Sequence, residues 1–204
     1  MKVDPAEISS DAAYYWMAAT IVPRPIAWVS TLNPDGSANL APFSFFTGVG
    51  SDPPTCLICV GRRTKTAIGE KKDTWANIER TGEFVINTVP DALAAAMNLT
   101  SKEYPAHTDE FVVAGVEKTA SEKVAPPRVT EAPVAFECRL HKIVEVGAPG
   151  DETAIIVGEI LLWHVRDDLL VGGRIDFGRL DAVARLGGAF YARTRERFEM
   201  TRPK

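Results

Sequence analysis

The segment around Ala41-Pro42 carries the side chains of this chain that are best suited to ligand chemistry. Asn39 and Ser44 flank it with an amide and a hydroxyl, and Phe43 adds an aromatic face. Because proline cannot donate a hydrogen bond to a sheet, we expect a strand to break into a loop here and to expose backbone N–H groups. This combination predicts a site for a flat heteroaromatic ligand with a polar edge. Alternatively, Asn39 and Ser44 are turn residues at the corner of a barrel.

A run of basic residues is the second candidate feature. Five cations lie close together with Glu70 as the one acid among them: Arg62, Arg63, Lys65, Lys71 and Lys72. Phosphate is bound by such charged donors, so the run indicates a possible phosphate patch. The alternative is a solvated loop at the start of a helix, which is how most charge runs behave.

The cysteines and histidines do not form a recognisable metal or redox motif. Cys56 and Cys59 have the spacing of a dithiol, but they lie in a continuous apolar run typical of a strand. Residues three apart on a strand point to opposite faces, so we expect reduced, structural thiols. The histidines are far apart in sequence and predict no metal site: His107, His141 and His164.

Runs of apolar and β-favouring residues predict about seven strands. They cover residues 26–32, 37–40, 43–49, 55–60, 83–89, 134–146 and 153–165. Asn33-Pro-Asp-Gly36 is a strong turn signal between the first two, since Pro pre-sets φ and Gly accepts positive φ. Residues 147–151 join the last two strands as a hairpin.

Helices are fewer and shorter. A helical lead-in covers residues 14–17, and residues 73–82 fit a helix that Asp73 caps and Gly82 ends with a left-handed residue. Residues 91–99 predict a second helix, capped by Asp91, and residues 177–191 are helical or partly irregular. The tail after residue 193 is expected to be solvated.

The spacing of these elements favours a mainly β fold, a closed antiparallel barrel with a few short peripheral helices. Residues 101–133 are polar and rich in proline, and we expect a long irregular surface segment with one short strand or helical piece. Gly48-Val-Gly50 is not a dinucleotide fingerprint, because no third glycine follows at the required place.

Composition sets limits on partners and location. The chain has 204 residues, is 46% hydrophobic and 25% charged, and carries a net charge of −4. The length fits one domain over residues 1–204. Negative charge disfavours nucleic acid and anionic lipid, and no apolar run approaches the roughly 20 residues of a membrane-spanning helix. The N-terminus lacks the features of a signal peptide, which predicts a cytoplasmic protein.

Four segments together resemble the flavin reductase-like family of FMN-binding split barrels. They are residues 25–46 (PIAWVSTLNPDGSANLAPFSFF), 72–87 (KDTWANIERTGEFVIN), 131–138 (EAPVAFEC) and 185–191 (RLGGAFY). The resemblance implies a split barrel with Greek-key strand order, a homodimer, and FMN bound at the subunit interface. It also implies cofactor contacts from Arg24, Ser30, Thr31, Asn39, Ala41, Pro42, Phe43, Ser44, Arg62, Lys72, Asp73 and Thr74.

Within that set, the resemblance assigns Arg62, Lys72 and Thr74 to the FMN phosphate. Pro42 and Phe43 would cover a face of the ring. In the alternative interpretations, Thr74 only helps to cap its helix, and most of the phenylalanines in this region belong in a core.

The function implied by the resemblance is that of an NAD(P)H:FMN oxidoreductase, in which NADH or NADPH passes hydride to FMN N5. Supply of reduced flavin to a monooxygenase is part of the same expectation. Such short flavin reductases often carry a C-terminal histidine, and residues 166–204 contain none. That departure supports an alternative, an FMN-bound electron-transfer protein like flavoredoxin. A non-enzymatic flavin-binding barrel is a third interpretation. A pyridoxamine-phosphate oxidase-like enzyme is disfavoured, because the sequence indicates too few basic residues outside the run to form such a site.

Overall fold

A seven-stranded antiparallel sheet forms the centre of the computed structural model, which describes residues 1–65 and 67–203. Its order is β3-β2-β6-β9-β10-β5-β4, so several neighbours in space are distant in sequence. The strands are β2 (Ala27–Leu32), β3 (Ala38–Phe43), β4 (Phe46–Ser51), β5 (Pro54–Val60), β6 (Glu83–Thr88), β9 (Val134–Val146) and β10 (Thr153–Val165). The mainly β class predicted from the sequence is confirmed.

The long β9–β10 hairpin gives the sheet much of its curvature. Its register shifts twice, between Val157 and Gly158 and again between Ile160 and Leu162, and such bulges bend and twist a strand. At Gly158 an added Cβ would lie only 2.3 Å from the Phe84 ring. Glycine is therefore required where the sheet curls around that ring.

The core lies inside the curled sheet. Val29, Ile58, Phe84 and Ile156 are completely or almost completely buried there, and Trp75 joins them from a helix. Strand β5 alternates as a half-buried strand should, so Cys56 is buried while Cys59 is only partly buried on the other face. Both cysteines are free thiols on opposite faces, as predicted.

Helix α2 (Asp73–Thr81) packs on β2 and β3. Its buried face includes Trp75 and Ile78, and Gly82 ends it at φ 71°, as predicted. The prediction that Asp73 caps this helix is wrong, because Lys72 is the N-cap residue and makes no side-chain capping bond. The Asp73 carboxylate instead pairs with Arg63.

Residues 89–133 contain more regular structure than the sequence predicted. They include the 3-10 helix η2 (Asp91–Leu93), α3 (Ala94–Leu99), α4 (Glu110–Ala114), and a small pair of strands, β7 (Lys118–Thr119) and β8 (Arg128–Val129). Asp91 does not cap a helix through its side chain, because its carboxylate binds Arg193 and Arg195. A second core cluster, which includes Trp28, forms between this region and β2 and β3.

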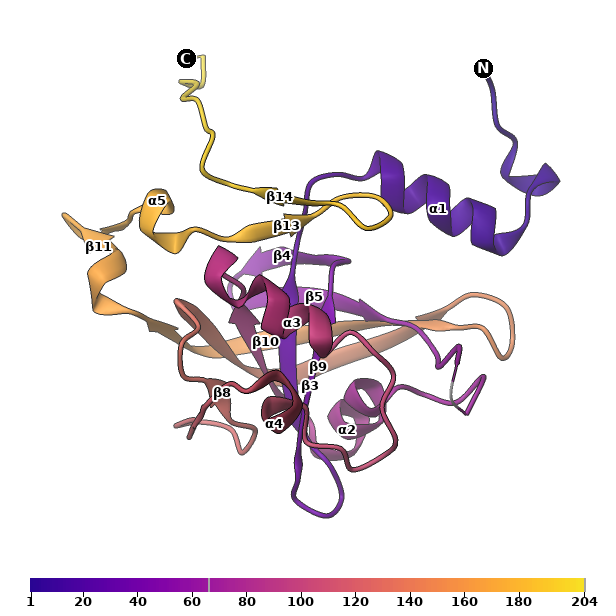
Figure 1. Cartoon of the computed structure of the whole chain (residues 1–204), viewed down its shortest axis with the longest axis horizontal. Helices are drawn as coiled ribbons and strands as arrows, with labels where there is room; N and C mark the ends of the chain where they lie inside the picture. The colour runs from indigo at the N-terminus through magenta and orange to yellow at the C-terminus, as the bar shows by residue number, and fades with distance from the viewer. Residues whose placement is uncertain (66, 204) are drawn as a thin grey trace.

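The N-terminal and C-terminal segments both lie on one side of the barrel, where β-strands from the two segments pair, while the termini themselves lie far apart (Figure 1). The N-terminal part contains the 3-10 helix η1 (Pro5–Glu7), α1 (Ser10–Thr20) and β1 (Arg24–Pro25), and β1 pairs with β13 (Val183–Arg185) and then β14 (Tyr191–Arg193). Between β10 and β13 lie η3 (Asp167–Leu169), β11 (Leu170–Val171), β12 (Arg174–Ile175) and α5 (Phe177–Leu180). The helical prediction for residues 177–191 holds only for α5, because the remainder finds its strand partner far away in the sequence.

The predicted break at Ala41-Pro42 is wrong. Strand β3 continues to Phe43, and the next strand begins only at Phe46. Proline is tolerated because β3 lies at the edge of the sheet, where a missing N–H removes no ladder bond if it faces away from the neighbouring strand.

Candidate functional site

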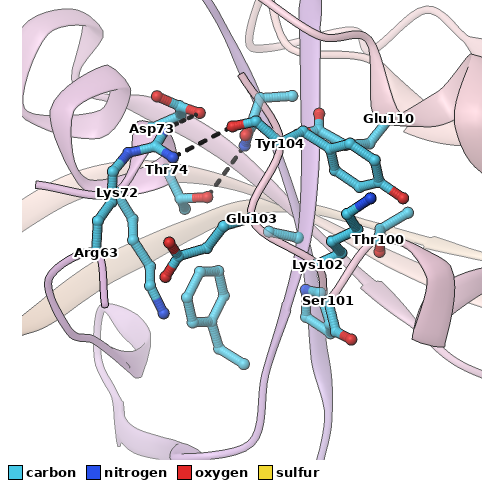
Figure 2. A pocket seen from close by; sticks show the side chains of 14 residues that line it. Arg63, Lys72, Asp73, Thr74, Thr100, Ser101, Lys102, Glu103, Tyr104 and Glu110 are labelled. Atoms are coloured by element: carbon cyan, nitrogen blue, oxygen red, sulfur yellow. Dashed lines mark hydrogen bonds and ion pairs between the residues drawn. The ribbon is translucent and has the colours of Figure 1, made fainter. Parts of the chain in front are cut away.

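A pocket of about 460 Å³, part of it open to solvent, lies between β3, the start of α2 and the segment that leads to α4. Figure 2 shows its lining side chains. The structure brings seven of the predicted site residues to this pocket: Asn39, Ala41, Pro42, Phe43, Lys72, Asp73 and Thr74. Residues from two distant segments of the sequence, β3 and the start of α2, thus form one site.

Asn39 belongs to a buried network of amides and hydroxyls. Its Nδ2 donates to Thr31 Oγ1 and to Thr74 Oγ1, each at 3.0 Å. Asn77 Nδ2 also donates to Thr31, at 3.0 Å, and to Asn33 at 2.8 Å. The side-chain amide of Asn39 therefore donates to groups inside the protein, and its role is to hold Thr74 in place. Because Thr74 accepts from Asn39, its own hydroxyl proton remains available for an oxygen in the pocket.

Lys72 and Arg63 supply positive charge at the α2 end of the pocket. Burial lowers the pKa of the Lys72 ammonium, while the Glu103 carboxylate works to raise it. Among the described residues, Lys72 Nζ makes no hydrogen bond or ion pair. Arg63 Nη2 lies 2.6 Å from Asp73 Oδ2, and its Nη1 donates to the Tyr104 carbonyl at 3.3 Å. Asp73 thus orients Arg63 beside Lys72.

Arg62, which the sequence analysis favoured as a phosphate ligand, lies outside the pocket. Its Nε is 2.6 Å from Glu152 Oε2, its Nη1 donates to the Gly69 carbonyl, and its guanidinium stacks on the Trp75 ring. Neighbouring residues on a chain in extended conformation point to opposite sides, so only one of Arg62 and Arg63 could face the pocket. The structure places Arg63 there.

Glu110 is a buried carboxyl at the pocket, and the sequence analysis did not single it out. It is 6% exposed, and its Oε2 accepts a bond from the Leu40 amide at 3.0 Å. Burial, together with the negative charges of Asp73 and Asp109, raises its pKa to about 7 despite that bond. Its short helix lies within a segment expected to be irregular, so no sequence signal pointed to it.

Residues 100–104 form the wall of the pocket that faces β3 and α2. Thr100 Oγ1 accepts from Trp28 Nε1 at 2.9 Å, which fixes the start of this segment to the core. Glu103 accepts bonds from the backbone amides of Thr64 and Lys65, both at 2.9 Å. These contacts join segments that are 39 and 72 positions apart, so no local pattern predicted this wall.

A second hollow adjoins the first. It contains about 610 Å³ of partly open space and shares Pro42, Phe43 and Ser101 with the pocket just described. Ser44, a predicted site residue, lines this hollow together with Tyr14 of α1 and other residues. The first hollow contains Lys72 and Arg63, and the second contains the rings of Tyr14 and Tyr191 together with Arg185.

The remaining predicted site residues lie behind the surface. Arg24 is 5% exposed, donates to the carbonyls of Ala18 and Leu186, and holds Ser44 Oγ at 3.3 Å. Ser30 is fully buried and donates its hydroxyl to the Pro127 carbonyl. Arg24, Ser30 and Thr31 can therefore support the two hollows without lining them.

The donor set fits a phosphate ester attached to an apolar ring. The Lys72 ammonium, the Arg63 guanidinium and the Thr74 hydroxyl meet at the N-terminus of the nine-residue helix α2, where the helix dipole also favours an anion. Pro42 and Phe43 lie next along β3 and offer apolar surface. Within residues 1–65 and 67–203, no cluster of three or more histidine, cysteine or acidic residues is placed to hold a metal ion. No helix in those residues is long and apolar enough to cross a membrane.

Sequence comparison relates the chain to flavin proteins. The model for the flavin reductase like domain matches residues 17–179. An uncharacterised protein of Aquifex aeolicus is 38% identical over 188 residues, 92% of each chain. The FMN reductase (NADH) RutF of Enterobacter cloacae is 28% identical over 123 residues, covering 59% of this chain and 68% of RutF.

Solved structures show the same fold. Nitrilotriacetate monooxygenase component B from Bacillus cereus has a TM-score of 0.93 and 31% identity, with 98% of each chain covered. The 2-nitrobenzoate 2-nitroreductase NbaA of Pseudomonas fluorescens has a TM-score of 0.86 and 32% identity, with coverage of 100% of this chain and 96% of NbaA. A putative flavin reductase with a split barrel domain from Shewanella frigidimarina, at 20% identity, has a TM-score of 0.83 with 100% of each chain covered, which supports the split-barrel fold alone.

Proposed function

The chain belongs to the flavin reductase-like domain family, and we propose that it is a cytoplasmic, single-domain FMN oxidoreductase that uses NADH or NADPH. The observation that carries this proposal is the pocket at the start of α2. There Lys72, Arg63 and the Thr74 hydroxyl form an anion site beside the apolar Pro42 and Phe43. The phosphate of FMN would occupy the cationic end, and its ring would extend along β3 toward Ser44.

When bound, FMN would supply the redox chemistry, which is hydride transfer from a reduced nicotinamide. The residues of this chain contribute binding and alignment. Lys72 and Thr74 hold the phosphate, Asn39 fixes Thr74, and Arg24 fixes Ser44 at the other end. In this proposal no side chain serves as a catalytic acid or base.

We also propose a homodimer and a redox partner. Helix α1 exposes Tyr14, Tyr15 and Met17 beside the second hollow, and such apolar side chains suit an interface with a second copy. The similarity to nitrilotriacetate monooxygenase component B supports a monooxygenase as the acceptor of reduced flavin.

An FMN-bound electron carrier is the second candidate. The absence of histidine from residues 166–204 favours it, because the nicotinamide site then lacks a residue common in short flavin reductases. Steady-state oxidation of NADH and NADPH with added FMN separates the two candidates. Turnover supports the reductase, whereas reduction by a ferredoxin-like donor without nicotinamide turnover supports the carrier.

Calorimetric titration of the full chain with FMN and riboflavin tests the binding site. We expect Lys72→Ala to weaken FMN binding roughly 10- to 100-fold, the value of a charged hydrogen bond, and to leave riboflavin binding unchanged. Asn39→Ala should weaken FMN binding less and leave the barrel folded, because it acts through Thr74. Lys142→Ala on the exposed face of β9 is the matched control.

Two results would contradict the proposal. A purified wild-type protein that is colourless and does not bind added FMN would indicate a barrel without a flavin function. Wild-type FMN affinity in Lys72→Ala would remove the phosphate from the α2 end of the pocket.

A further inference from the structure

One end of the pocket is closed by a link between two loops. Glu103 Oε1 accepts bonds from the Thr64 amide at 2.9 Å and the Thr64 hydroxyl at 3.2 Å, and its Oε2 accepts from the Lys65 amide at 2.9 Å. The carboxylate is therefore fixed by three donors from the other loop. Arg63, the residue before Thr64, donates to the carbonyl of Tyr104, the residue after Glu103.

This link lies at the cationic end of the pocket. Glu103, Lys72 and Arg63 all line it there, and Figure 2 shows the Glu103 carboxylate near the Lys72 ammonium. The pocket thus contains two cations for an anionic ligand and, beside them, one anion that hydrogen bonds hold in place.

We propose that Glu103 makes the pocket selective for a flavin mononucleotide over the dinucleotide, FAD. The inference rests on the proposed function, because it concerns the phosphate end of the same flavin site. It adds a specificity-determining residue that does not itself bind the flavin.

Charge and hydrogen bonding both support this selectivity. A single terminal phosphate is matched by Lys72, Arg63 and the Thr74 hydroxyl. In this proposal the second phosphate of FAD lies beyond that point, beside the Glu103 carboxylate, which lines the same end of the pocket. Like charges brought together disfavour the wrong ligand, and the carboxylate cannot turn away without leaving the Thr64 and Lys65 amides without their acceptor.

Calorimetric titration of the full chain with riboflavin, FMN and FAD tests the inference. We expect wild type to bind FMN at least roughly tenfold more tightly than FAD, since like-charge contacts at a binding surface are strongly unfavourable. Glu103→Gln removes the charge and keeps one acceptor, and Glu103→Ala also removes the link. Both variants should reduce the FMN preference several-fold by improving FAD binding. Glu159→Gln, a surface carboxylate that pairs with Arg139, is the matched control and should keep the wild-type ratio.

The outcomes separate this inference from the proposed function. Equal wild-type affinity for FMN and FAD, or an unchanged preference in Glu103→Gln, overturns the role of Glu103 and leaves the flavin site intact. Absence of binding of any flavin by wild type overturns the proposed function instead. If Glu103→Ala does not fold, as judged by its thermal transition, Glu103→Gln alone decides.

Discussion

Glu110 and Glu137 are both almost completely buried, yet their surroundings shift their pKa values in opposite directions. Glu110 interacts with the backbone amides of Leu40 and of Glu110 itself, and the carboxylates of Asp73 and Asp109 lie nearby. Burial and these charges raise its pKa to about 7. Burial would also raise the pKa of Glu137, but its donors outweigh that effect and hold the pKa below the ordinary value.

The donors of Glu137 come from two elements. The amides of Glu122 and Lys123 lie 2.8 and 2.5 Å from its two oxygens, and His164 Nε2 lies 2.5 Å from Oε1. Glu137 on β9 thereby fastens the 120–127 loop to the sheet. A buried carboxylate with a full set of donors is a structural anchor.

The opposite pKa shifts of Glu110 and Glu137 show that the protein keeps a destabilised carboxylate at the pocket. Glu110, which lacks such a set of donors, is the carboxyl that lines the pocket. Perturbed acids of this kind gather at functional sites, because ligands rather than protein groups complete their surroundings. Glu137, remote from the pocket, shows the same side chain fully satisfied.

Replacement of Glu137, the buried anchor, should change the free energy of unfolding most. We expect Glu137→Ala to lower the free energy of unfolding by about 3–5 kcal/mol, because it removes a fully buried carboxylate and leaves the Glu122 and Lys123 amides and His164 without their acceptor. Urea unfolding followed by circular dichroism measures the change. A loss below about 1 kcal/mol would show that water replaces the carboxylate and that the loop is not anchored by it.

Glu110→Gln should raise the free energy of unfolding at neutral pH, whereas Glu137→Ala lowers it. The folded-state pKa of Glu110 lies above its unfolded value, so ionisation destabilises the folded chain progressively as pH rises from about 4.5 to about 7. The glutamine keeps an acceptor for the Leu40 amide and carries no charge. We expect the variant to unfold like wild type below about pH 4.5 and to be more stable by up to about 3 kcal/mol above pH 7.

Unfolding by urea at a series of pH values measures this difference. For Glu137 the sign is reversed, since a lowered pKa contributes stability that is present above the unfolded pKa and is lost in acid. A stability difference between Glu110→Gln and wild type that stays constant from pH 4 to pH 8 would refute the raised pKa.

A much smaller effect should come from Glu83, which holds the same 120–127 loop from a half-buried position. Its Oε2 accepts the Ala125 amide at 2.8 Å. We expect Glu83→Ala to lower the free energy of unfolding by about 1 kcal/mol, the value of one ordinary hydrogen bond. Glu159→Ala, which breaks an exposed pair with Arg139, should change it by less still. Equal losses at Glu83 and Glu137 would mean that burial and donor number do not set the contribution of a carboxylate.

Local signals in the sequence predicted the local elements well. The Gly82 helix end, the alternation of β5 and the long β9–β10 hairpin all follow from residue types within a few positions. Helix capping by Asp73 and Asp91 was predicted wrongly for one shared reason. Arg63 binds the Asp73 carboxylate, and Arg193 and Arg195 bind the Asp91 carboxylate. Neither carboxylate is then available to cap a helix.

The sequence predicted part of the pocket lining and missed residues 100–104 and Glu110. Sequence patterns pointed to β3 and the start of α2, which the structure brings together, and the assignment of these residues to FMN stays a prediction. Glu103 and Glu110 could not be found this way, because they reach the pocket through a segment without a periodic pattern. The choice of Arg63 over Arg62 depends on side-chain direction, which a run of basic residues does not reveal.

Pro42 has a consequence beyond the pocket. Strands β3 and β4 are the two edges of the seven-stranded sheet, and an open edge is a template for pairing with another chain. On β3, Pro42 has no N–H to offer and Glu110 occupies the Leu40 amide, while β4 loses its regular register between Gly48 and Gly50. Pro42 and Glu110, which line the candidate pocket, therefore also disfavour edge-to-edge aggregation at β3, and the register shift does so at β4.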